Sequence, residues 1–175
     1  MISKVLIGFT ETPTGNAGEI EINTSSLSIT NNEQISVRNE GTGIGGNVTI
    51  TGDRFTLNSS SISASANEDG GNISVNASDL DVSDSRIEAE SDSSTGGNIT
   101  IGGDSTFFQD SDLSASAADK GDGGNITIDA DTVLGLNSDI TATAFLGDGG
   151  NILIDADAVI GFAKSRSPNL FVADI

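Results

Sequence analysis

Pairs of apolar residues separated by one polar residue recur along the chain at nearly equal intervals. Each pair follows a short anchor, which reads Gly-Gly-Asn in five copies and Ala-Gly-Glu in a degenerate first copy. The last residues of the six anchors are Glu19, Asn47, Asn72, Asn98, Asn125 and Asn151, spaced 28, 25, 26, 27 and 26 residues apart. The pairs are Ile20/Ile22, Val48/Ile50, Ile73/Val75, Ile99/Ile101, Ile126/Ile128 and Ile152/Ile154. Alternation with a period of two in β-branched residues predicts a short strand with one buried face.

Two further apolar runs follow the anchor pair. The first lies eight and ten residues past the anchor in the first three copies, at Leu27/Ile29, Phe55/Leu57 and Leu80/Val82. The second lies near fifteen and seventeen, at Ile62/Ala64/Ala66, Ile87/Ala89, Leu113/Ala115/Ala117 and Ile140/Ala142/Ala144. No segment sustains a period of 3.6 residues, so helices are not expected. Each repeat therefore predicts three short strands.

One repeat of this kind cannot bury its own apolar face, whereas stacked repeats bury a continuous column and pair each backbone with the coils on either side. We therefore predict an all-β fold, a right-handed parallel β-helix (solenoid) of about six coils of roughly 26 residues each. The right-handed sense is that of parallel crossover connections. Residues 1–14 are expected to form a partial coil or cap, and residues 15–175 the repeat domain. Its last coil is expected to be incomplete, with an insert near 163–172.

Three features of the repeat lead to finer expectations. The second strand of the fifth and sixth copies reads Val-Leu-Gly-Leu at 133–136 and Val-Ile-Gly-Phe at 159–162, which shifts the apolar positions by one and suggests a bulge or a longer corner. The Gly-Gly pairs are expected to supply positive φ angles and close approach between coils. The anchor residues Asn47, Asn72, Asn98, Asn125 and Asn151 are expected to stack as a hydrogen-bonded ladder along the rod.

Composition narrows the possible partners. The chain has 26 acidic and 7 basic residues, a net charge of −19, which disfavours nucleic acid and anionic membranes. It has no Cys, so disulfides, thiolate metal sites and thiol catalysis are excluded. No segment approaches the length of a membrane span. The apolar run at residues 5–9 is shorter than the core of a signal peptide, so for a secreted protein the signal is expected outside this chain.

Acidic residues recur four and six positions past the anchors. Asp129, Asp131, Asp155 and Asp157 are expected to form one patch on adjacent coils, and they are weak candidates for a calcium site because calcium prefers clusters of hard oxygen ligands. A solvated acidic face is the alternative and the preferred interpretation. No other cofactor is expected.

The outer face of the third strand is rich in hydroxyl groups, at Ser61/Ser63/Ser65, Ser114/Ser116 and Thr141/Thr143. Ladder packing is the simpler interpretation, and a planar face that binds glycan or ice is the alternative. Arg86, Glu88 and Glu90 interrupt the row, which argues against a regular lattice-binding surface. A polysaccharide-active enzyme would need carboxylates near a basic residue in a groove. Arg54 beside Asp53 is the best such pair, but a local ion pair at a corner is the preferred interpretation. No catalytic residues are therefore assigned, and no enzyme activity is expected.

The segment Gly-Asp-Gly-Gly-Asn-Ile-Thr-Ile-Asp-Ala-Asp at 121–131, followed by Asn-Ser-Asp-Ile-Thr-Ala-Thr-Ala at 137–144, resembles the repeats of filamentous-haemagglutinin-like exoproteins, most closely the large cyanobacterial members. The resemblance covers roughly residues 15–175. It implies a right-handed β-helix, export by two-partner secretion and a role in adhesion. The Asn-Pro-Asn motif of the family's amino-terminal secretion domain is absent, and Ser167-Pro168-Asn169 lies at the other end. The chain therefore resembles an internal or terminal stretch of such a protein.

The expected function is that of a structural and adhesive β-helix segment of a secreted or cell-surface exoprotein. The expected partners are a glycan or protein receptor, an outer-membrane secretion partner for the full-length protein, and other copies joined end to end through exposed strand edges. Two alternatives stay open: a polysaccharide-active β-helix enzyme, and a calcium-stabilised glycan-binding module.

Overall fold

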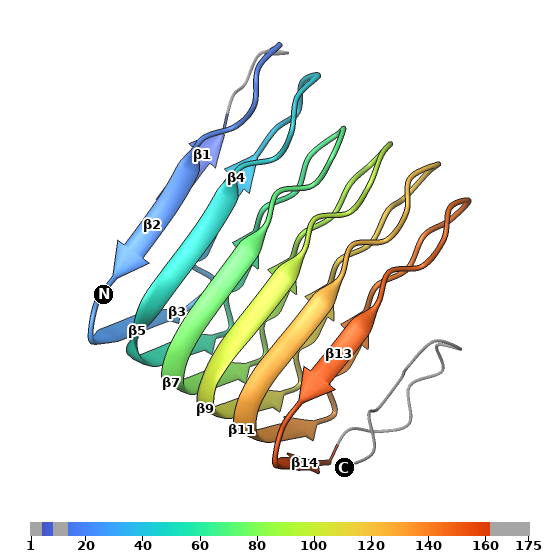
Figure 1. Ribbon diagram of the computed structural model, residues 1–175. Helices are drawn as coiled ribbons and strands as arrows, with labels where there is room; N and C mark the ends of the chain where they lie inside the picture. Colours follow the sequence, from blue (N-terminus) through green and yellow to red (C-terminus); the bar gives the residue numbers. More distant parts are fainter. Residues whose placement is uncertain (1–4, 9–13, 162–175) are drawn as a thin grey trace.

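A computed structural model describes residues 5–8 and 14–161. They form a parallel β-solenoid of about five turns with roughly 26 residues per turn, and this part of the chain contains no helix. In Figure 1 the chain runs down the near side, crosses to the far side at the lower corner and returns upward while advancing from left to right, so the winding is right-handed. The predicted fold class is confirmed. The predicted insert near 163–172 lies outside the described residues.

Two parallel sheets form the walls of the solenoid. The first sheet has six strands, β1 (Val5–Gly8), β4 (Gln34–Arg38), β6 (Ser61–Ser63), β8 (Arg86–Glu88), β10 (Asp112–Ser114) and β12 (Asp139–Thr141). The second sheet contains β2 (Glu19–Asn23), β3 (Ser26–Thr30), β5 (Asn47–Asn58), β7 (Ile73–Ser83), β9 (Ile99–Gln109), β11 (Ile126–Leu136), β13 (Ile152–Asp155) and β14 (Ala158–Ile160). Because β1 pairs with β4, residues 5–8 extend the first sheet by one strand.

The first two strands predicted for each repeat are one bent strand in the four central coils. β5, β7, β9 and β11 each run for 11 or 12 residues and curve around the lower corner in Figure 1. Pairing between neighbouring coils is interrupted at the bend, where Asp53, Ser78, Asp104 and Asp131 lie, and resumes in the same register beyond it. Hydrogen bonds to the neighbouring coils on both sides of the bend keep the strand continuous. The apolar pattern alone divides the same segment into two strands.

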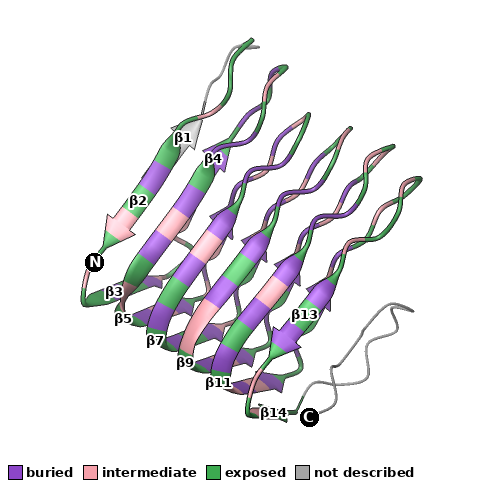
Figure 2. Cartoon of the chain, in the orientation of Figure 1, coloured by how far each residue is buried: buried purple, intermediate pink, exposed green. Residues whose placement is uncertain are grey.

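Buried and exposed residues alternate along the strands, as Figure 2 shows by its colours. The anchor-pair residues Val48, Ile73, Ile99 and Ile126 occupy equivalent positions on paired strands, and each is at most 1% exposed. The residue directly after the third strand contributes a smaller inward side chain in the coils at Ala64, Ala89, Ala115 and Ala142, where the two walls converge. The predicted inward faces are therefore those of the structure.

The bulge expected in the later coils is absent from β9 and β11, which keep the register of the earlier coils. Val133 pairs with Thr106 and Gly135 with Phe108, and all four residues are buried. The apolar residues Leu134 and Leu136 consequently point outward. The prediction was wrong because a one-residue slip would reverse every side chain of the strand and break its bonds to the next coil, which costs more than exposing two leucines.

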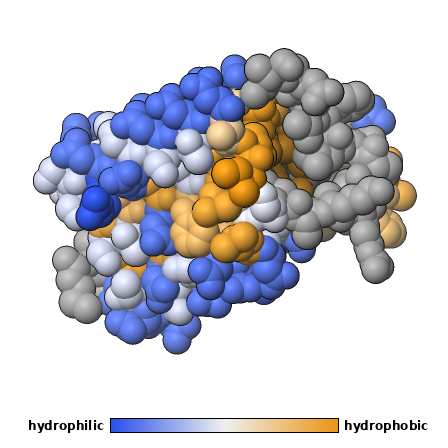
Figure 3. Space-filling view, turned by 90° about the horizontal axis from the view of Figure 1, so that it is seen from below, coloured by the Kyte–Doolittle hydropathy of each residue, from blue (hydrophilic) through white to orange (hydrophobic). Residues whose placement is uncertain are grey.

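These outward residues form an apolar row on one face of the rod. Phe107, Leu134 and Ile160 are paired across three successive strands, and Leu136 and Ile160 are 43% and 56% exposed. Figure 3, which views the rod from below, shows apolar surface on this face. The row replaces the polar residues Thr56 and Asp81 of the earlier coils at the same register position.

The Gly-Gly pairs allow close approach between coils but do not adopt positive φ. Their role is steric: a Cβ on Gly71 would lie 1.8 Å from the carbonyl oxygen of Gly46, and one on Gly97 would lie 1.8 Å from that of Gly71. Gly71 N donates to Ala64 O at 2.7 Å, which closes the loop at the narrow end of the coil. Positive φ occurs instead at the corner before the third strand, with 47–50° at Ser59, Asp84, Asp110 and Asn137. Asn and Asp tolerate this conformation better than most residues, so the corner needs no glycine.

The inward column can be tested by placing one charge on each face of β11. Ile126 is fully buried, and the adjacent Thr127 lies on the outward face. Ile126→Asp buries a carboxyl group among Ile and Val neighbours and should cost several kcal/mol even after protonation. Thr127→Asp should cost about 0.5 kcal/mol, as for most surface changes. Thermal melts followed by circular dichroism measure both, and equal melting temperatures would contradict the register.

Candidate binding groove

The five anchor asparagines form a continuous ladder on the outside of the second sheet. The side-chain oxygen of Asn47 accepts hydrogen bonds from Asn72 N at 3.0 Å and from Asn72 Nδ2 at 3.2 Å. The same pair of bonds joins Asn72 to Asn98, Asn98 to Asn125, and Asn125 to Asn151, at 2.9–3.2 Å. All five side chains are thus engaged along the rod, which gives them a structural role.

A second ladder, of buried serines, was not recognised from the sequence. Ser60, Ser85, Ser111 and Ser138 follow the positive-φ corner, and each is at most 8% exposed. Ser85 Oγ accepts from Ser60 N at 3.1 Å, Ser111 Oγ from Ser85 N at 3.2 Å, and Ser138 Oγ from Ser111 N at 3.2 Å. Each hydroxyl also donates to the carbonyl two residues before it, as Ser85 does to Ser83 O at 2.6 Å. The signal was present, because each serine lies thirteen residues past an anchor asparagine.

The four acidic candidates do not assemble into a metal site. Asp129 and Asp155 are paired on neighbouring strands, whereas Asp131 and Asp157 follow at the bend, and all four are exposed. Among residues 5–8 and 14–161 no group of three or more carboxylates lies close enough to hold a metal ion. The geometry is that of a solvated acidic face, and calcium binding stays a prediction.

The charge pair that the sequence suggested for an enzyme is arranged differently in the structure. Arg54 Nη2 lies 3.1 Å from Asp79 Oδ2 on the next coil, so the arginine pairs across the coils with Asp79. Both side chains are more than half exposed, and surface pairs of this kind contribute little to stability. Asp53, the neighbour in sequence, lies at the bend of β5.

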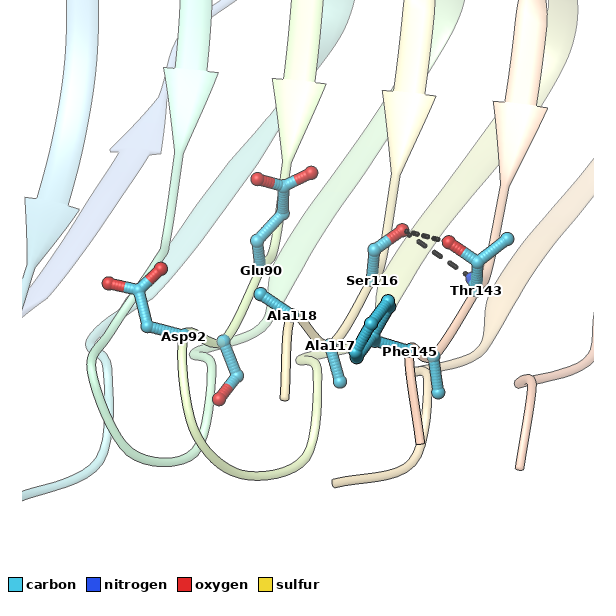
Figure 4. Close-up of a pocket in the computed structure, with 9 residues that line it drawn as sticks. Glu90, Asp92, Ser116, Ala117, Ala118, Thr143 and Phe145 are labelled. Atoms are coloured by element: carbon cyan, nitrogen blue, oxygen red, sulfur yellow. Dashed lines mark hydrogen bonds between the residues drawn. The ribbon is translucent and has the colours of Figure 1, made fainter. Parts of the chain in front are cut away.

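A groove of about 360 Å³ runs across three coils just beyond the ends of β8, β10 and β12. Its polar side chains include Glu90, Asp92, Ser116 and Thr143, and Phe145 lies at one side (Figure 4). Phe145 is 76% exposed, the largest exposure among the large apolar residues of the described chain. The groove therefore combines carboxylates, hydroxyls and a free aromatic face.

A chain of hydroxyl groups links the floor of this groove. Ser114 Oγ donates to Glu90 Oε1 at 2.5 Å, and Ser114 Oγ lies 3.0 Å from Ser116 Oγ, which lies 3.1 Å from Thr143 Oγ1. A hydroxyl has one proton, so with Ser114 donating to Glu90, Ser116 must donate to Ser114 and Thr143 to Ser116. All the dipoles point toward the Glu90 carboxylate, which holds it in place.

Glu88 lies two residues before Glu90, on the outward face of β8. Its pKa is raised above the usual value of 4.5, first by burial and next by the charge of Glu90, while Arg86 acts in the opposite direction. Arg86 also bridges outward, with Nε 3.5 Å from Asp112 Oδ2. Burial, assisted by the nearby carboxylates, therefore makes Glu88 harder to ionise than an exposed glutamate.

Sequence reasoning noted Glu88, Glu90 and the hydroxyl row, but it did not bring Asp92 or Phe145 into a site. These two residues lie twenty positions past their anchors, with Ala118 between them on the intervening coil. Counting the polar and aromatic residues at fixed offsets beyond the third strand would have grouped them.

No protein-family model, curated protein or solved structure matches the chain significantly. None of the described residues form a helix that could span a membrane.

The serine ladder predicts a cost for removing one hydroxyl. Ser85→Ala leaves the buried Ser60 N–H without its acceptor, and an unsatisfied buried donor costs about 1–3 kcal/mol. Ser74→Ala, on the outward face of β7, should change the free energy of unfolding by less than about 0.5 kcal/mol. Urea denaturation measures both, and equal midpoints would show that the ladder contributes nothing.

The raised pKa of Glu88 predicts a pH-dependent gain from neutralising it. The protonated form is favoured in the folded state, so its contribution to stability is full below the unfolded pKa and is lost as pH rises through the folded pKa. Glu88→Gln should therefore raise the melting temperature at about pH 7, and the gain should shrink as the pH falls toward about 3, where wild-type Glu88 is largely protonated in both states. Glu21→Gln, on an exposed face of β2, is the control. A gain independent of pH would refute this assignment.

Proposed function

We propose that the chain is a structural and adhesive β-solenoid segment of a secreted or cell-surface exoprotein, and that its groove beyond β8, β10 and β12 binds a glycan without transforming it. The observation that carries the proposal is the groove itself, in which the exposed ring of Phe145 flanks a row of hydroxyl and carboxylate groups. A ring with one free face and convergent polar groups suits a ligand with both apolar and hydroxyl-bearing surfaces.

The surroundings of the groove support a binding role because they hold its polar groups in place. Every coil of the wall is bonded to its neighbours by the parallel sheet, and Glu90, Ser116 and Thr143 lie on three adjacent coils. Their spacing is set by the backbone, and Ser114 fixes the Glu90 carboxylate. A prearranged site loses little conformational entropy when a ligand binds.

The setting in a larger exoprotein rests on the repeat. The Gly-Gly-Asn anchors and their apolar pairs resemble filamentous-haemagglutinin-like repeats, so we propose export with an outer-membrane partner. A signal peptide and secretion domain encoded upstream would support this setting. End-to-end association is also proposed, because β2, β12 and β13 lie at the edges of the described sheets and edge strands can pair with another chain.

A polysaccharide-active enzyme is the second candidate, and Glu88 favours it. A half-buried carboxyl with a raised pKa beside a second carboxylate is a common arrangement for acid catalysis. The two proposals differ in outcome: an enzyme releases new reducing ends from a polysaccharide on long incubation, and a binding segment leaves the polymer intact.

Phe145 provides the direct test of glycan binding. Calorimetric titration with hexose oligomers of neutral, acetylated and amine-bearing kinds should show binding to at least one of them. Phe145→Ala should weaken that binding by about tenfold, the equivalent of 1.4 kcal/mol, in the range of an aromatic contact. Leu146→Ala is the matched control, because Leu146 is the adjacent residue and is 65% exposed but does not line the groove.

The same titration, repeated with a chelator, distinguishes the proposed segment from a calcium-stabilised glycan-binding module. A chelator should leave both the melting temperature and the affinity unchanged, since no three carboxylates converge in the described part of the chain. A fall in either would favour the calcium-stabilised module. Absence of binding to all three kinds of oligomer would contradict a glycan-binding groove.

A further inference from the structure

We propose that the groove selects a cationic, amine-bearing glycan, such as a polymer of hexosamine units with free amino groups. The inference rests on the proposed function, because it names the ligand class for the same groove. It follows from the charge of the lining, the fixed position of one carboxylate and the exposed ring two coils away in the same groove.

The charge of the lining excludes acidic sugars and disfavours neutral ones. Glu90 and Asp92 are the ionisable residues of the lining, and both are acidic. Arg38, on another coil, lies 3.9 Å from Asp92 and 3.3 Å from Glu40, so its single positive charge is shared between two carboxylates. A sulfated or carboxylated glycan would meet like charge, and a neutral one would desolvate carboxylates without replacing their interaction with water.

Glu90 is oriented for a cation. Its Oε1 accepts from Ser114, at the end of the chain of hydroxyls that begins at Thr143. The bond restrains the side chain and leaves Oε2 as the acceptor for an ammonium N–H. A charge-assisted hydrogen bond of this kind is about twice as strong as a neutral one. The whole chain has a net charge of −19, which adds long-range attraction for a polycation.

Phe145 supplies the second half of the recognition. In Figure 4 its ring lies beside Ala117 and below Ser116 and Thr143, and Glu90 and Asp92 belong to the coil beyond the one that carries Ala117. An amino sugar presents C–H groups on one side of its ring and an ammonium group at its rim. The aromatic face attracts both, through apolar contact and through its negative quadrupole.

The experiment compares two oligomers of equal length, one of glucosamine units and one of N-acetylglucosamine units, by calorimetric titration at low salt and at a pH that keeps the amines protonated. The glucosamine oligomer should bind at least about tenfold more tightly, as expected for one hydrogen bond between charged groups. Glu90→Gln should abolish this preference while Oε1 still accepts from Ser114. Asp131→Asn removes the same charge from the exposed bend of β11, away from the groove, and should preserve the preference.

Each alternative outcome has a defined meaning. If the two oligomers bind with equal affinity and Phe145→Ala weakens the binding of both, the proposed function is supported and the selectivity for amines is overturned. Binding of neither oligomer would overturn the inference, and it would overturn the proposed function as well if a neutral hexose oligomer also failed to bind. The preference for the glucosamine oligomer could fall equally in Glu90→Gln and Asp131→Asn, or a lysine oligomer of the same length could bind as tightly as the glucosamine oligomer. Either result would show general attraction of cations to an acidic chain and overturn the inference.

Discussion

The register of hydrogen bonds between successive coils is the constraint on which the rest of the structure depends. Paired residues on neighbouring strands lie 25–30 positions apart in the sequence, and between β5 and β7 and between β9 and β11 the pairing extends through five consecutive positions on either side of a bend. Once that register is set, every position of one coil lies beside its equivalents on the next. Each residue must therefore pack against the equivalent residue of the next coil as well as fit its own position within the coil.

That constraint explains why small residues and short polar side chains dominate the corners. At Gly71 and Gly97 the backbones of adjacent coils come so close that a Cβ would overlap a carbonyl oxygen. At the opposite corner the chain turns through positive φ at Asp84 and Asp110, and the buried serine that follows satisfies the backbone of the neighbouring coil. The two corners thus solve different problems, one of space and one of backbone conformation, and glycine is required only for the first.

The division between what was predictable and what was not follows from this repetition. The fold, the coil length, the inward faces and the stacking of the asparagines depend on residues that recur at one fixed offset, so period and alternation reveal them. The merging of two strands into one, the outward leucines 134 and 136 and the positive-φ corner depend on hydrogen bonds that alternation does not report. The groove was missed because Asp92 and Phe145 lie 53 residues apart and meet only when the intervening coil is placed between them.

In a stacked repeat the residues that maintain the stack are alike from coil to coil, so specific recognition must come from positions where the coils differ. At the offset of Glu90 the successive coils carry Glu, Ser and Thr, and at the offset of Asp92 they carry Asp, Ala and Phe. These changes cost the stack little, because the side chains point outward from a wall whose bonds are made by the backbone. They also place one carboxylate, one small residue and one ring at a separation that the coil spacing determines. The backbone of the wall tolerates these substitutions and also fixes the distances between the substituted side chains. The groove therefore arises where three neighbouring coils carry different residues at equivalent positions.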